Sequence, residues 1–400
     1  MDRDYAKITV TPKGERSLRA RHPWVYANEI TGAEGEFSDG DVVDVYSQKG
    51  KWLGAGFINS HSKIRVRIIS RNANDRFDGA FWTRRLQYAV DYRKTVMGED
   101  FSNCRLIFGE SDGLPGLTVD RFEDVLVAQC LCLGTELRKE FLYKTLVDIM
   151  SKEGVKITAV YERNDAPIRI KEGLEQEKGF AIGSGDGHVL ITENGIKYDV
   201  DYINGQKTGF FLDQKYNRQA VAKIARGKRV LDLFTHTGAF GLNCAKGGAE
   251  SVTSVDISQD ALDSARKNAE MNGLPVEYLK ADIFQLLTQM AQEKRHDYDL
   301  IILDPPAFTK SGATVKSAIR GYKEINMKAM RLLPRGGYLA TCSCSHFMTN
   351  QLFRDMLRSA AQDADVSLKQ IEERRQSPDH PISWDAPETD YLKFYIFQIV

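Results

Sequence analysis

Two cysteines stand two residues apart in the run TCSCS at 341–345, at the end of the apolar stretch GGYLA. A cysteine thiolate is a nucleophile, and its addition to C6 of cytosine would make C5 reactive enough to accept a methyl group. Loss of the C5 proton and of the thiol would then restore the base. Because side chains alternate along a strand, Cys342 and Cys344 start on the same side, with Cys344 at or past the strand tip. We therefore expect Cys344 to be the nucleophile and Cys342 to be a buried structural residue, with two structural cysteines as the alternative.

The cysteine content does not indicate a metal or disulfide protein. The six cysteines stand at positions 104, 130, 132, 244, 342 and 344. No CxxC occurs, and both CxC pairs lie in apolar, strand-like runs, whereas zinc ligands usually come from turns. Six cysteines in 400 residues are also too sparse for a disulfide scaffold. We expect no metal site.

Three aspartates follow three consecutive apolar segments in the second half of the chain. Asp232 comes after KRVL, Asp256 ends SVTSVD and Asp282 ends VEYLKAD, while Gly238 lies in a turn that a ligand could approach closely. Three carboxylates at one sheet edge need matching donors, such as an amine, an adenine amino group and ribose hydroxyls, and they repel phosphates. S-adenosylmethionine (SAM) therefore fits better than NAD or ATP. The alternative for each aspartate taken alone is a helix N-cap.

The fourth apolar segment ends in LDPPAF at 303–308. Pro305 and Pro306 fix an extended turn without amide donors, which leaves the Asp304 carboxylate and nearby carbonyls to face a substrate. Amino-group methyltransferases use a similar Asp-Pro-Pro-aromatic sequence to hold a base, but here an alanine precedes the aromatic Phe308. We expect this turn to line the substrate site, with Asp304 taking part in catalysis.

These residues need a sheet whose strands end at one edge. From about residue 216, helix and strand patterns alternate, and the strand-like segments are KRVLDLF, SVTSVD, VEYLKAD, YDLIILD, GGYLATCS and a final LKFYIFQIV. This alternation predicts a doubly wound, mostly parallel sheet. Two alternating runs around Asn194-Gly195, within 188–202, predict a hairpin in front of it.

The N-terminal residues, 1–73, contain short β segments separated by turns, which is typical of a small β barrel. A basic stretch in this region includes Arg16, Arg19 and Arg21 and is followed by Trp24. Basic residues interleaved with aromatic ones suit nucleic acid. A core tryptophan with solvated arginines explains the same stretch equally well.

A middle region, 74–187, has an α+β pattern. It predicts an amphipathic helix over 75–100, then a hairpin, a second helix and a strand, and it holds no catalytic constellation. We therefore expect three domains, at 1–73, 74–187 and 188–400.

Composition limits the class of protein. The chain is 42% hydrophobic and 28% charged, with a net charge of zero, so no bulk electric field attracts a polyanion. No run of about 18 apolar residues occurs, and the N-terminus lacks the apolar core of a signal peptide. We expect a soluble cytoplasmic protein without a membrane partner.

Several motifs together resemble one family. They are RHPWVY at 21–26, GESDGLPGLTVDRF at 109–122, GQKTGFFLDQKYNR at 205–218, DLFTHTGAF at 232–240, DPPAF at 304–308, RGYKEINM at 320–327, TCSCS, and SPDHP at 377–381. In this order they are similar to the bacterial large-subunit rRNA cytosine-5 methyltransferases that join an N-terminal PUA domain to a class I methyltransferase. The resemblance covers nearly the whole chain.

The resemblance implies a multidomain α/β fold with a PUA-like β barrel, an α+β middle domain and a seven-stranded Rossmann-like methyltransferase domain. It implies 23S rRNA as the partner and leaves open whether the protein forms a homodimer. The expected SAM-binding residues are Lys207, Thr208, Gly209, Phe210, Phe211, Asp213, Asp232, Phe234, Thr237, Gly238, Asp256, Ile257, Ser258, Asp282 and Asp304. The expected catalytic residues are Cys344 and Asp304, and the expected substrate-binding residues are Arg16, Arg19, Arg21, Pro305, Pro306, Phe308 and His380.

The chain also departs from the usual motifs. The GxGxG loop of methyltransferases keeps only its last glycine, with Phe234 and His236 in the earlier positions. DPPAF lacks the second cysteine that other RNA cytosine methyltransferases use for product release, so release needs another group. His380 lines the base pocket in one interpretation and is a capping or packing histidine in the other.

Two other functions remain open from the sequence. An rRNA guanine or adenine N-methyltransferase would use a DPP motif but would need no thiol. A non-catalytic RNA-binding assembly factor would keep the fold and bind no SAM.

Overall fold

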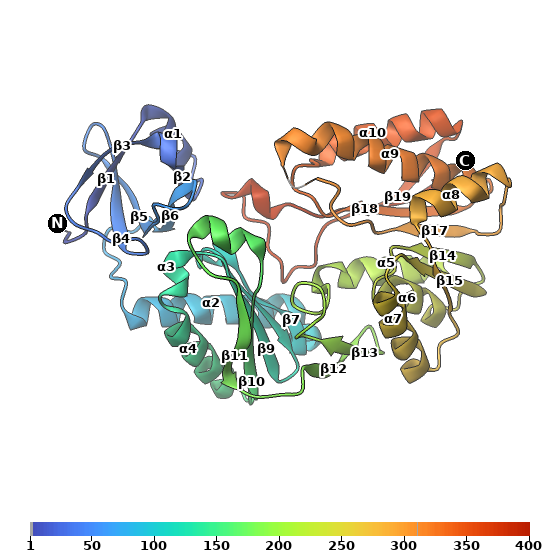
Figure 1. The fold of residues 1–400 in the computed structure, drawn as a ribbon, viewed down its shortest axis with the longest axis horizontal. Coiled ribbons are helices and arrows are strands. Elements are labelled where there is room, and N and C mark those ends of the chain that lie inside the picture. Colours follow the sequence, from blue (N-terminus) through green and yellow to red (C-terminus); the bar gives the residue numbers. More distant parts are fainter. Residues whose placement is uncertain (1–2, 310) are drawn as a thin grey trace. The chain divides into compact units, whose positions relative to one another are not determined.

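The computed structural model describes residues 3–309 and 311–400. The chain forms two compact units, which Figure 1 shows as ribbons. The first unit consists of Met1–Leu190, Val200–Leu212 and Pro378–Thr389, and the second of Ile191–Asp199, Asp213–Ser377 and Asp390–Val400. The predicted division into three domains stays a prediction.

The N-terminal part of the first unit is a six-stranded sheet with strand order β2-β6-β5-β4-β1-β3. Its strands are β1 (Lys7–Val10), β2 (Trp24–Tyr26), β3 (Ile30–Glu34), β4 (Val42–Ser47), β5 (Trp52–Ile58) and β6 (Ile64–Ser70). The alternation of buried valines and isoleucines along them builds the core. The basic stretch forms a helix that we did not predict, α1 (Pro12–Arg19), which begins where the Thr11 hydroxyl caps the Gly14 N–H.

The rest of the first unit is built on a five-stranded sheet in the order β11-β10-β9-β8-β7. Its strands are β7 (Asn103–Phe108), β8 (Leu117–Phe122), β9 (Val125–Cys130), β10 (Ala159–Asn164) and β11 (Glu177–Gly183), and its helices are α2 (Gly79–Met97), α3 (Leu133–Glu136) and α4 (Lys139–Lys152). The predicted amphipathic helix, hairpin, second helix and strand are confirmed as α2, β7–β8, α4 and β10. The edge strand β11 was not predicted.

The predicted hairpin is confirmed as β12 (His188–Glu193) and β13 (Ile196–Asp201). Its turn residues Asn194 and Gly195 both have positive φ, 54° and 71°. That geometry matches the twist of two strands joined by a two-residue turn.

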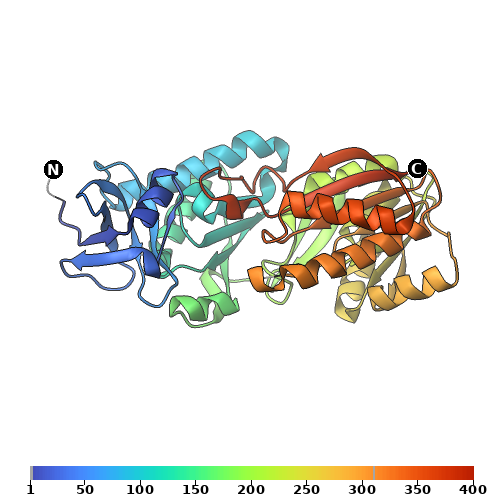
Figure 2. The same ribbon diagram turned by 90° about the horizontal axis from the view of Figure 1, so that it is seen from above.

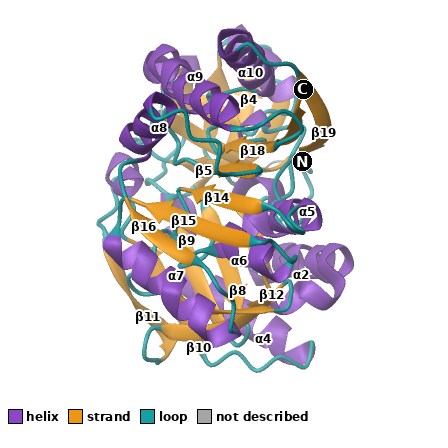
Figure 3. Ribbon diagram, turned by 90° about the vertical axis from the view of Figure 1, so that its right-hand side faces the viewer, coloured by secondary structure: helices purple, strands orange, loops and turns teal. Residues whose placement is uncertain are grey.

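The second unit contains a seven-stranded sheet in the order β16-β15-β14-β17-β18-β20-β19, in which β20 alone runs opposite to the other strands. Figure 3 labels β14, β15, β16, β18 and β19 of this sheet. The strands are β14 (Arg229–Leu233), β15 (Ser251–Asp256), β16 (Glu277–Lys280), β17 (Leu300–Leu303), β18 (Tyr338–Ser343), β19 (Leu368–Arg374) and β20 (Lys393–Ile399). This confirms the doubly wound, mostly parallel sheet. The six strands predicted by position are present, and β19 is the seventh.

Helices cover both faces of this sheet. The helices are α5 (Lys215–Ile224), α6 (Ala239–Lys246), α7 (Gln259–Asn272), α8 (Ile283–Gln292), α9 (Val315–Leu332) and α10 (Asn350–Ala364). One face packs its apolar side chains against α8, α9 and α10, and the other against α5 and α6. None of the described helices combines the length and apolarity needed to cross a membrane.

Candidate active site

The first strand end of the sheet is organised by Asp232, whose side chain is fully buried. Its Oδ2 accepts hydrogen bonds from the Thr235 hydroxyl and the Gly241 N–H (2.9 Å), with the Ser254 hydroxyl at 3.4 Å. Burial raises the pKa of Asp232 to about 6, and the charge of Asp304 adds to the shift. Asp232 therefore holds the loop from β14 to α6 in place.

This loop takes the shape of a glycine-rich turn with few glycines. Phe234, His236 and Gly238 all have positive φ, at 64°, 51° and 81°. Phe234 and His236 thus occupy the conformation for which the usual motif supplies glycine. Each costs about 1 kcal/mol or more of backbone strain, and such strain is typical of ligand-binding loops.

At the second strand end, the Asp256 carboxylate accepts hydrogen bonds from two backbone N–H groups, those of His236 and Ser258, both at 3.0 Å. These bonds fix the carboxylate beside the loop after β14. The next side chain, Ile257, is 61% exposed, which is high for a large apolar residue. The Ser258 hydroxyl caps α7 by accepting from the Ala261 N–H.

Asp282 follows β16 and caps α8, since its carboxylate accepts a hydrogen bond from the Gln285 N–H at 3.0 Å. Asp282 therefore acts as a helix N-cap, which was the alternative interpretation of this residue. Its contact with an adenine stays a prediction. Thr237 also contributes to this edge, because its carbonyl accepts from the Asn268 amide at 3.1 Å.

The residues at this edge fit SAM. Among the described residues, Asp232 Oδ1 is buried and has no hydrogen-bond partner, so it suits an amine donor. The exposed Ile257 side chain offers an apolar surface for an adenine ring, and Asp256 suits ribose hydroxyls. When bound, SAM supplies an electrophilic methyl group.

The third part of the site is Asp304, which follows β17. Its Oδ1 accepts from the Gln214 amide at 3.1 Å and lies 2.8 Å from Cys342 Sγ. Burial raises the pKa of Asp304, while the hydrogen bond from the Cys342 thiol opposes that shift. Burial and the Asp304 charge raise the pKa of Cys342 well above its usual value, so its thiol stays protonated and donates.

Cys344 has different surroundings. It stands one residue beyond β18, and it is partly exposed while the other five cysteines are buried. Strands β17 and β18 are neighbours, with Leu303 opposite Thr341, so the ends carrying Asp304 and Cys344 lie at the same edge. Cys342 is buried, as predicted, and also contacts the expected catalytic carboxylate, while the role of Cys344 as nucleophile stays a prediction.

A buried lysine holds the segment that carries Cys344. Lys393 is 1% exposed and lies opposite Ser343 in the β18–β20 pair. Its Nζ donates to the carbonyls of Ser345 (2.5 Å) and Tyr391 (2.7 Å). Burial lowers the pKa of Lys393 to about 8, opposed by Asp390 and by Cys344.

The turn after Asp304 is partly packed into the protein. Pro305 is buried, Pro306 is exposed, and the Phe308 ring lies 4.5 Å from the Tyr322 ring, measured between centroids. Phe308 thus helps to hold this turn against α9. Contacts of these three residues with a substrate stay predictions.

The expected cofactor residues are divided between the two units. Lys207, Thr208, Gly209, Phe210 and Phe211 belong to the first unit. There the Thr208 hydroxyl donates to the buried Asp120 carboxylate at 2.5 Å. The other expected cofactor residues belong to the second unit, where the Asp213 carboxylate accepts from the Tyr391 hydroxyl at 2.7 Å.

The expected arginines and His380 all lie in the first unit. Arg16 is exposed, Arg19 pairs with Glu15 on α1 and Arg21 pairs with Asp385 at 3.1 Å. The Trp24 indole donates to Glu110 at 3.0 Å, so the tryptophan is partly buried and anchored.

His380 itself is 2% exposed, and its Nδ1 lies 2.9 Å from the Asp379 carboxylate. Its ring packs 5.5 Å from Phe108. This environment matches the packing alternative for His380. A contact with the base stays only a prediction.

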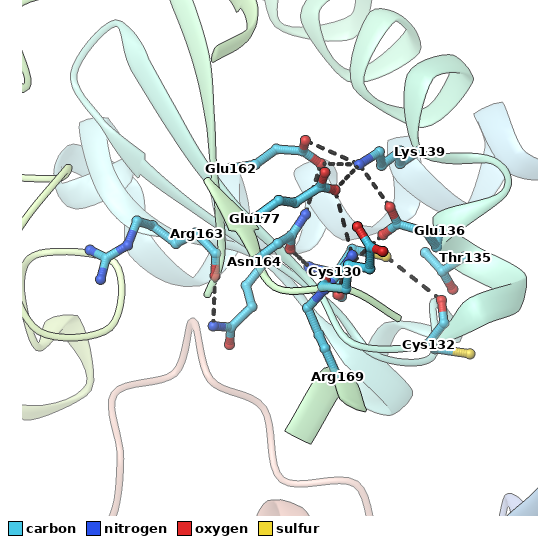
Figure 4. Close-up of polar contacts among 12 residues, drawn as sticks. Cys130, Cys132, Thr135, Glu136, Lys139, Glu162, Arg163, Asn164, Arg169 and Glu177 are labelled. Atoms are coloured by element: carbon cyan, nitrogen blue, oxygen red, sulfur yellow. Dashed lines mark hydrogen bonds and ion pairs between the residues drawn. The ribbon is translucent and has the colours of Figure 1, made fainter. Parts of the chain in front are cut away.

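Figure 4 shows a second polar cluster, in the middle of the first unit. Lys139 Nζ lies 2.7 Å from Glu136, 3.1 Å from Glu162 and 2.8 Å from Glu177, and Arg169 pairs with Glu136 at 2.8 Å. Each cation here is matched by carboxylates, as expected for a structural network. Across 3–309 and 311–400, no group of three or more His, Cys, Asp or Glu side chains is placed to hold a metal ion.

Two residues of the site were not singled out from the sequence, Gln214 and Lys393. Gln214 lies within GQKTGFFLDQKYNR and links Asp304 to the amide of Asn217, which donates to Gln214 Oε1 at 2.6 Å. A polar amide before a helix carries no distinctive signal. Lys393 begins the final apolar strand, and because lysines are rarely buried, its residue type did not indicate a buried position.

Comparisons with known proteins show which families the chain resembles. Residues 8–71 match a PUA-like domain, and residues 180–397 match the S-adenosylmethionine-dependent methyltransferases. The chain is 45% identical, over 95% of its length and 96% of the relative's, to Ribosomal RNA large subunit methyltransferase I of Photobacterium profundum. It is 43% identical, over 95% of its length and 96% of the relative's, to the protein of the same name in Aeromonas salmonicida.

Solved structures show the same fold. A SAM-dependent methyltransferase from Streptococcus mutans superposes with a TM-score of 0.82 at 22% identity, covering 98% of this chain and 99% of that one. A methyltransferase complexed with S-adenosylhomocysteine (SAH) gives a TM-score of 0.83 at 22% identity and the same coverage. The predicted combination of a PUA-like domain with a class I methyltransferase fold is confirmed.

Proposed function

Because the chain belongs to the S-adenosylmethionine-dependent methyltransferase family, together with the proteins named ribosomal RNA large subunit methyltransferase I, we propose that it methylates C5 of a cytosine in 23S rRNA. SAM is the cofactor of this family, as predicted. The target base and the thiol mechanism are the proposal.

One observation carries the proposal: a partly exposed thiol and a carboxylate stand at the ends of neighbouring parallel strands. Cys344 follows β18, and Asp304 follows β17. A transfer to an exocyclic amino group needs no thiol, whereas C5 of cytosine needs one because it is a weak nucleophile. The partial exposure of Cys344 leaves its sulfur accessible to a base, which the buried Cys342 lacks.

In the proposed reaction, the Cys344 thiolate forms a bond to C6 and the electron pair of the C5–C6 double bond moves to C5. C5 then attacks the methyl group, and SAH leaves. A base takes the C5 proton, the C5–C6 double bond reforms, and the C6–S bond breaks to return the thiolate. Asp304 lies beside the reacting groups and positions the cytosine that is methylated.

The experiment uses 23S rRNA in which cytidine is replaced by 5-fluorocytidine. Fluorine at C5 blocks the elimination step, so a covalent protein–RNA adduct should accumulate in the presence of SAM. The adduct is detected on a denaturing gel for the wild type, Cys344→Ala and Cys342→Ala. We expect the adduct to be lost in Cys344→Ala and retained in Cys342→Ala.

Other outcomes redirect the proposal. Loss of the adduct only in Cys342→Ala would keep the reaction and correct the nucleophile. Methyl transfer to RNA without any adduct would contradict the thiol mechanism and favour N-methylation of guanine or adenine. Absence of SAM binding in an equilibrium titration would favour a non-catalytic RNA-binding factor.

A further inference from the structure

A pocket of about 430 Å³ lies within the first unit and is lined by the end of β6, by α2 and by the segment Pro378–Thr389. The segment contacts α2 directly, because the Tyr92 hydroxyl donates to the Pro378 carbonyl at 2.9 Å. Figure 2 draws both as ribbons, with the segment in red and α2 in cyan. Pockets of this size hold small ligands or single groups of larger ones. None of the expected SAM-binding residues lines it.

Two half-buried arginines in this pocket have no carboxylate partner among residues 3–309 and 311–400. Arg71 donates only to the carbonyls of Arg21 (2.6 Å) and His22 (3.0 Å), and its buried Nε has no hydrogen-bond partner in the described chain. Arg85 donates to the Ile69 carbonyl at 2.9 Å. Burial lowers the pKa of both guanidiniums and Arg21 adds to this shift at Arg71, while the charges of Asp385 at Arg71 and of Asp75 at Arg85 oppose it. An anion in the pocket would reduce the free-energy cost of burying the two guanidinium charges and would supply the missing hydrogen-bond acceptor.

The acids around the pocket already have other partners. Glu110 pairs with Arg67 at 2.9 Å, and Asp112 pairs with the fully buried Arg93 at 2.6 Å. Asp385 lies 3.1 Å from Arg21. The charge of Asp385 acts on Arg71 as well, but no ion pair joins these acids to Arg71 or Arg85, so the two guanidiniums can still bind an anion.

The same pocket carries two exposed aromatic rings. Tyr88 and Tyr92 lie one turn apart on α2 and are 62% and 37% exposed. Exposed aromatic side chains beside arginines are the usual surface for an unstacked base with its phosphate. A simple inorganic anion would use the arginines and leave Tyr88 without a role.

We propose that this pocket binds one nucleotide of a single-stranded RNA segment, with its phosphate on Arg71 and Arg85 and its base against Tyr88. The inference rests on the proposed function, since it assigns a place for the RNA substrate in the first unit, whereas Cys344 and Asp304 belong to the second. It predicts that the pocket contributes to RNA affinity and leaves SAM binding unchanged.

The test measures binding of a single-stranded RNA oligonucleotide containing 4-thiouridine at several salt concentrations. Arg71→Gln/Arg85→Gln should weaken binding about tenfold or more, because charge-assisted hydrogen bonds are lost. It should also reduce the magnitude of the slope of log affinity against log salt by about 0.7, because one phosphate contact is lost. Tyr88→Ala should weaken binding about fivefold or more.

Arg84→Gln is the matched control. Arg84 neighbours Arg85 on α2, lies outside the pocket lining and pairs with Asp75, so its loss should change affinity less than about twofold. All variants should bind SAH in calorimetry and give the far-UV circular dichroism spectrum and thermal melt of the wild type, which together show that both units fold. Photo-crosslinks of the oligonucleotide should map to the tryptic peptide Leu86–Arg93.

The failures are distinguishable. If both pocket variants bind RNA as the wild type does and crosslinks map elsewhere, the pocket proposal is wrong, while methyl transfer by the wild type keeps the proposed function. If the wild type neither binds the oligonucleotide nor methylates 23S rRNA, both proposals fall.

Discussion

Cys342 and Cys344 stand on the same face of β18, yet their thiols have different surroundings. Both pack on the side of the sheet covered by α5 and α6. Cys342 is fully buried against Asp304, and its raised pKa keeps it a thiol. Alternation along a strand predicted their shared side, but no sequence rule predicted the Cys342–Asp304 hydrogen bond, because it depends on the packing of two strand ends.

We predict that Cys344 is the one fast-reacting cysteine of the folded protein. Alkylation needs an accessible thiolate, and the other five cysteines are buried. Iodoacetamide at neutral pH should modify one cysteine per chain in the native state and six after denaturation, with mass spectrometry identifying the site. Cys344→Ser should remove the fast phase. A fast phase that persists in this variant would contradict the prediction.

Lys393 should make stability depend on pH above neutrality. Its pKa is about 8 in the folded protein and about 10.4 in an unfolded chain, so the unfolded state binds more protons between these values. Burying the charged lysine lowers the free energy of unfolding. This destabilisation is fully present below pH 8 and disappears as the pH rises toward 10.4. The free energy of unfolding of the wild type should therefore rise with pH, relative to Lys393→Met, by about 3 kcal/mol across this window.

Denaturant unfolding of both proteins at pH 7.5 and pH 10.5 measures this difference. Both proteins carry Cys344→Ala, because a cysteine titrates in this pH range and the charge of Cys344 acts on Lys393, so the comparison isolates the lysine. Equal pH dependence of wild type and Lys393→Met would contradict a lowered pKa.

At the scale of elements, the regular strands and helices of the second unit were predictable, and the exceptions share one cause. Several of the predicted strands, such as β17 (LIIL) and β20 (KFYIFQI), are buried along most of their length. Strand β19 reads LKQIEER and is mostly exposed at the sheet edge, so only its pairing with β20 makes it a strand. Likewise α1 has eight residues including a glycine, and its Thr11 cap and packing decide its conformation.

The loop after β14 was predictable in position but not in conformation. Gly238 indicated a close approach of a ligand, and its positive φ agrees with a turn. Phe234 and His236 rarely adopt positive φ, so their residue types argue against the conformation they have. The hydrogen bonds of Asp232 and Asp256 to this loop impose it.

Gly241 should be indispensable for the packing of α6 against the sheet. A Cβ at this position would lie 2.5 Å from the Ser254 hydroxyl and 3.1 Å from Asp232 Oδ2. Gly241→Ala should lower the free energy of unfolding by about 1–3 kcal/mol through overpacking and should weaken SAH binding by disturbing the loop. Thermal melts and calorimetry measure the two effects.

Ser254→Ala provides the matched control, because it removes the atom that the new methyl group meets first. The double variant Gly241→Ala/Ser254→Ala should recover part of the lost stability. Equal stability of Gly241→Ala and the double variant would show that the collision with Ser254 is not the cause.

At the scale of the whole molecule, each unit is assembled from separate parts of the chain. Pro378–Thr389 follows β19 in sequence but belongs to the first unit, as does Val200–Leu212. No sequence pattern predicted that these two segments belong to the first unit. The predicted domain boundary at 187/188 was based on where the pattern of apolar residues changes. The two segments are short and irregular, so only their side-chain and backbone contacts assign them to a unit.

Asp379 is the main anchor of Pro378–Thr389. Its buried carboxylate accepts from the Arg105 N–H (2.8 Å), and its carbonyl accepts from the fully buried Arg93 at 3.0 Å. Asp379→Ala would leave the Arg105 N–H without its acceptor, so we expect a loss of about 2–3 kcal/mol in the free energy of unfolding. Hydrogen exchange should accelerate in peptides of α2 and β7. Peptides of α8 and α10, in the second unit, should exchange as in the wild type.

Asp385→Asn, in the same segment, is the control for this prediction. Asp385 forms an exposed ion pair with Arg21, so its loss should cost less than about 1 kcal/mol and leave exchange in α2 unchanged. If Asp379→Ala accelerated exchange equally in both units, the segment would stabilise the whole chain rather than the first unit. If it changed neither stability nor exchange, the anchor would lie elsewhere in Pro378–Thr389.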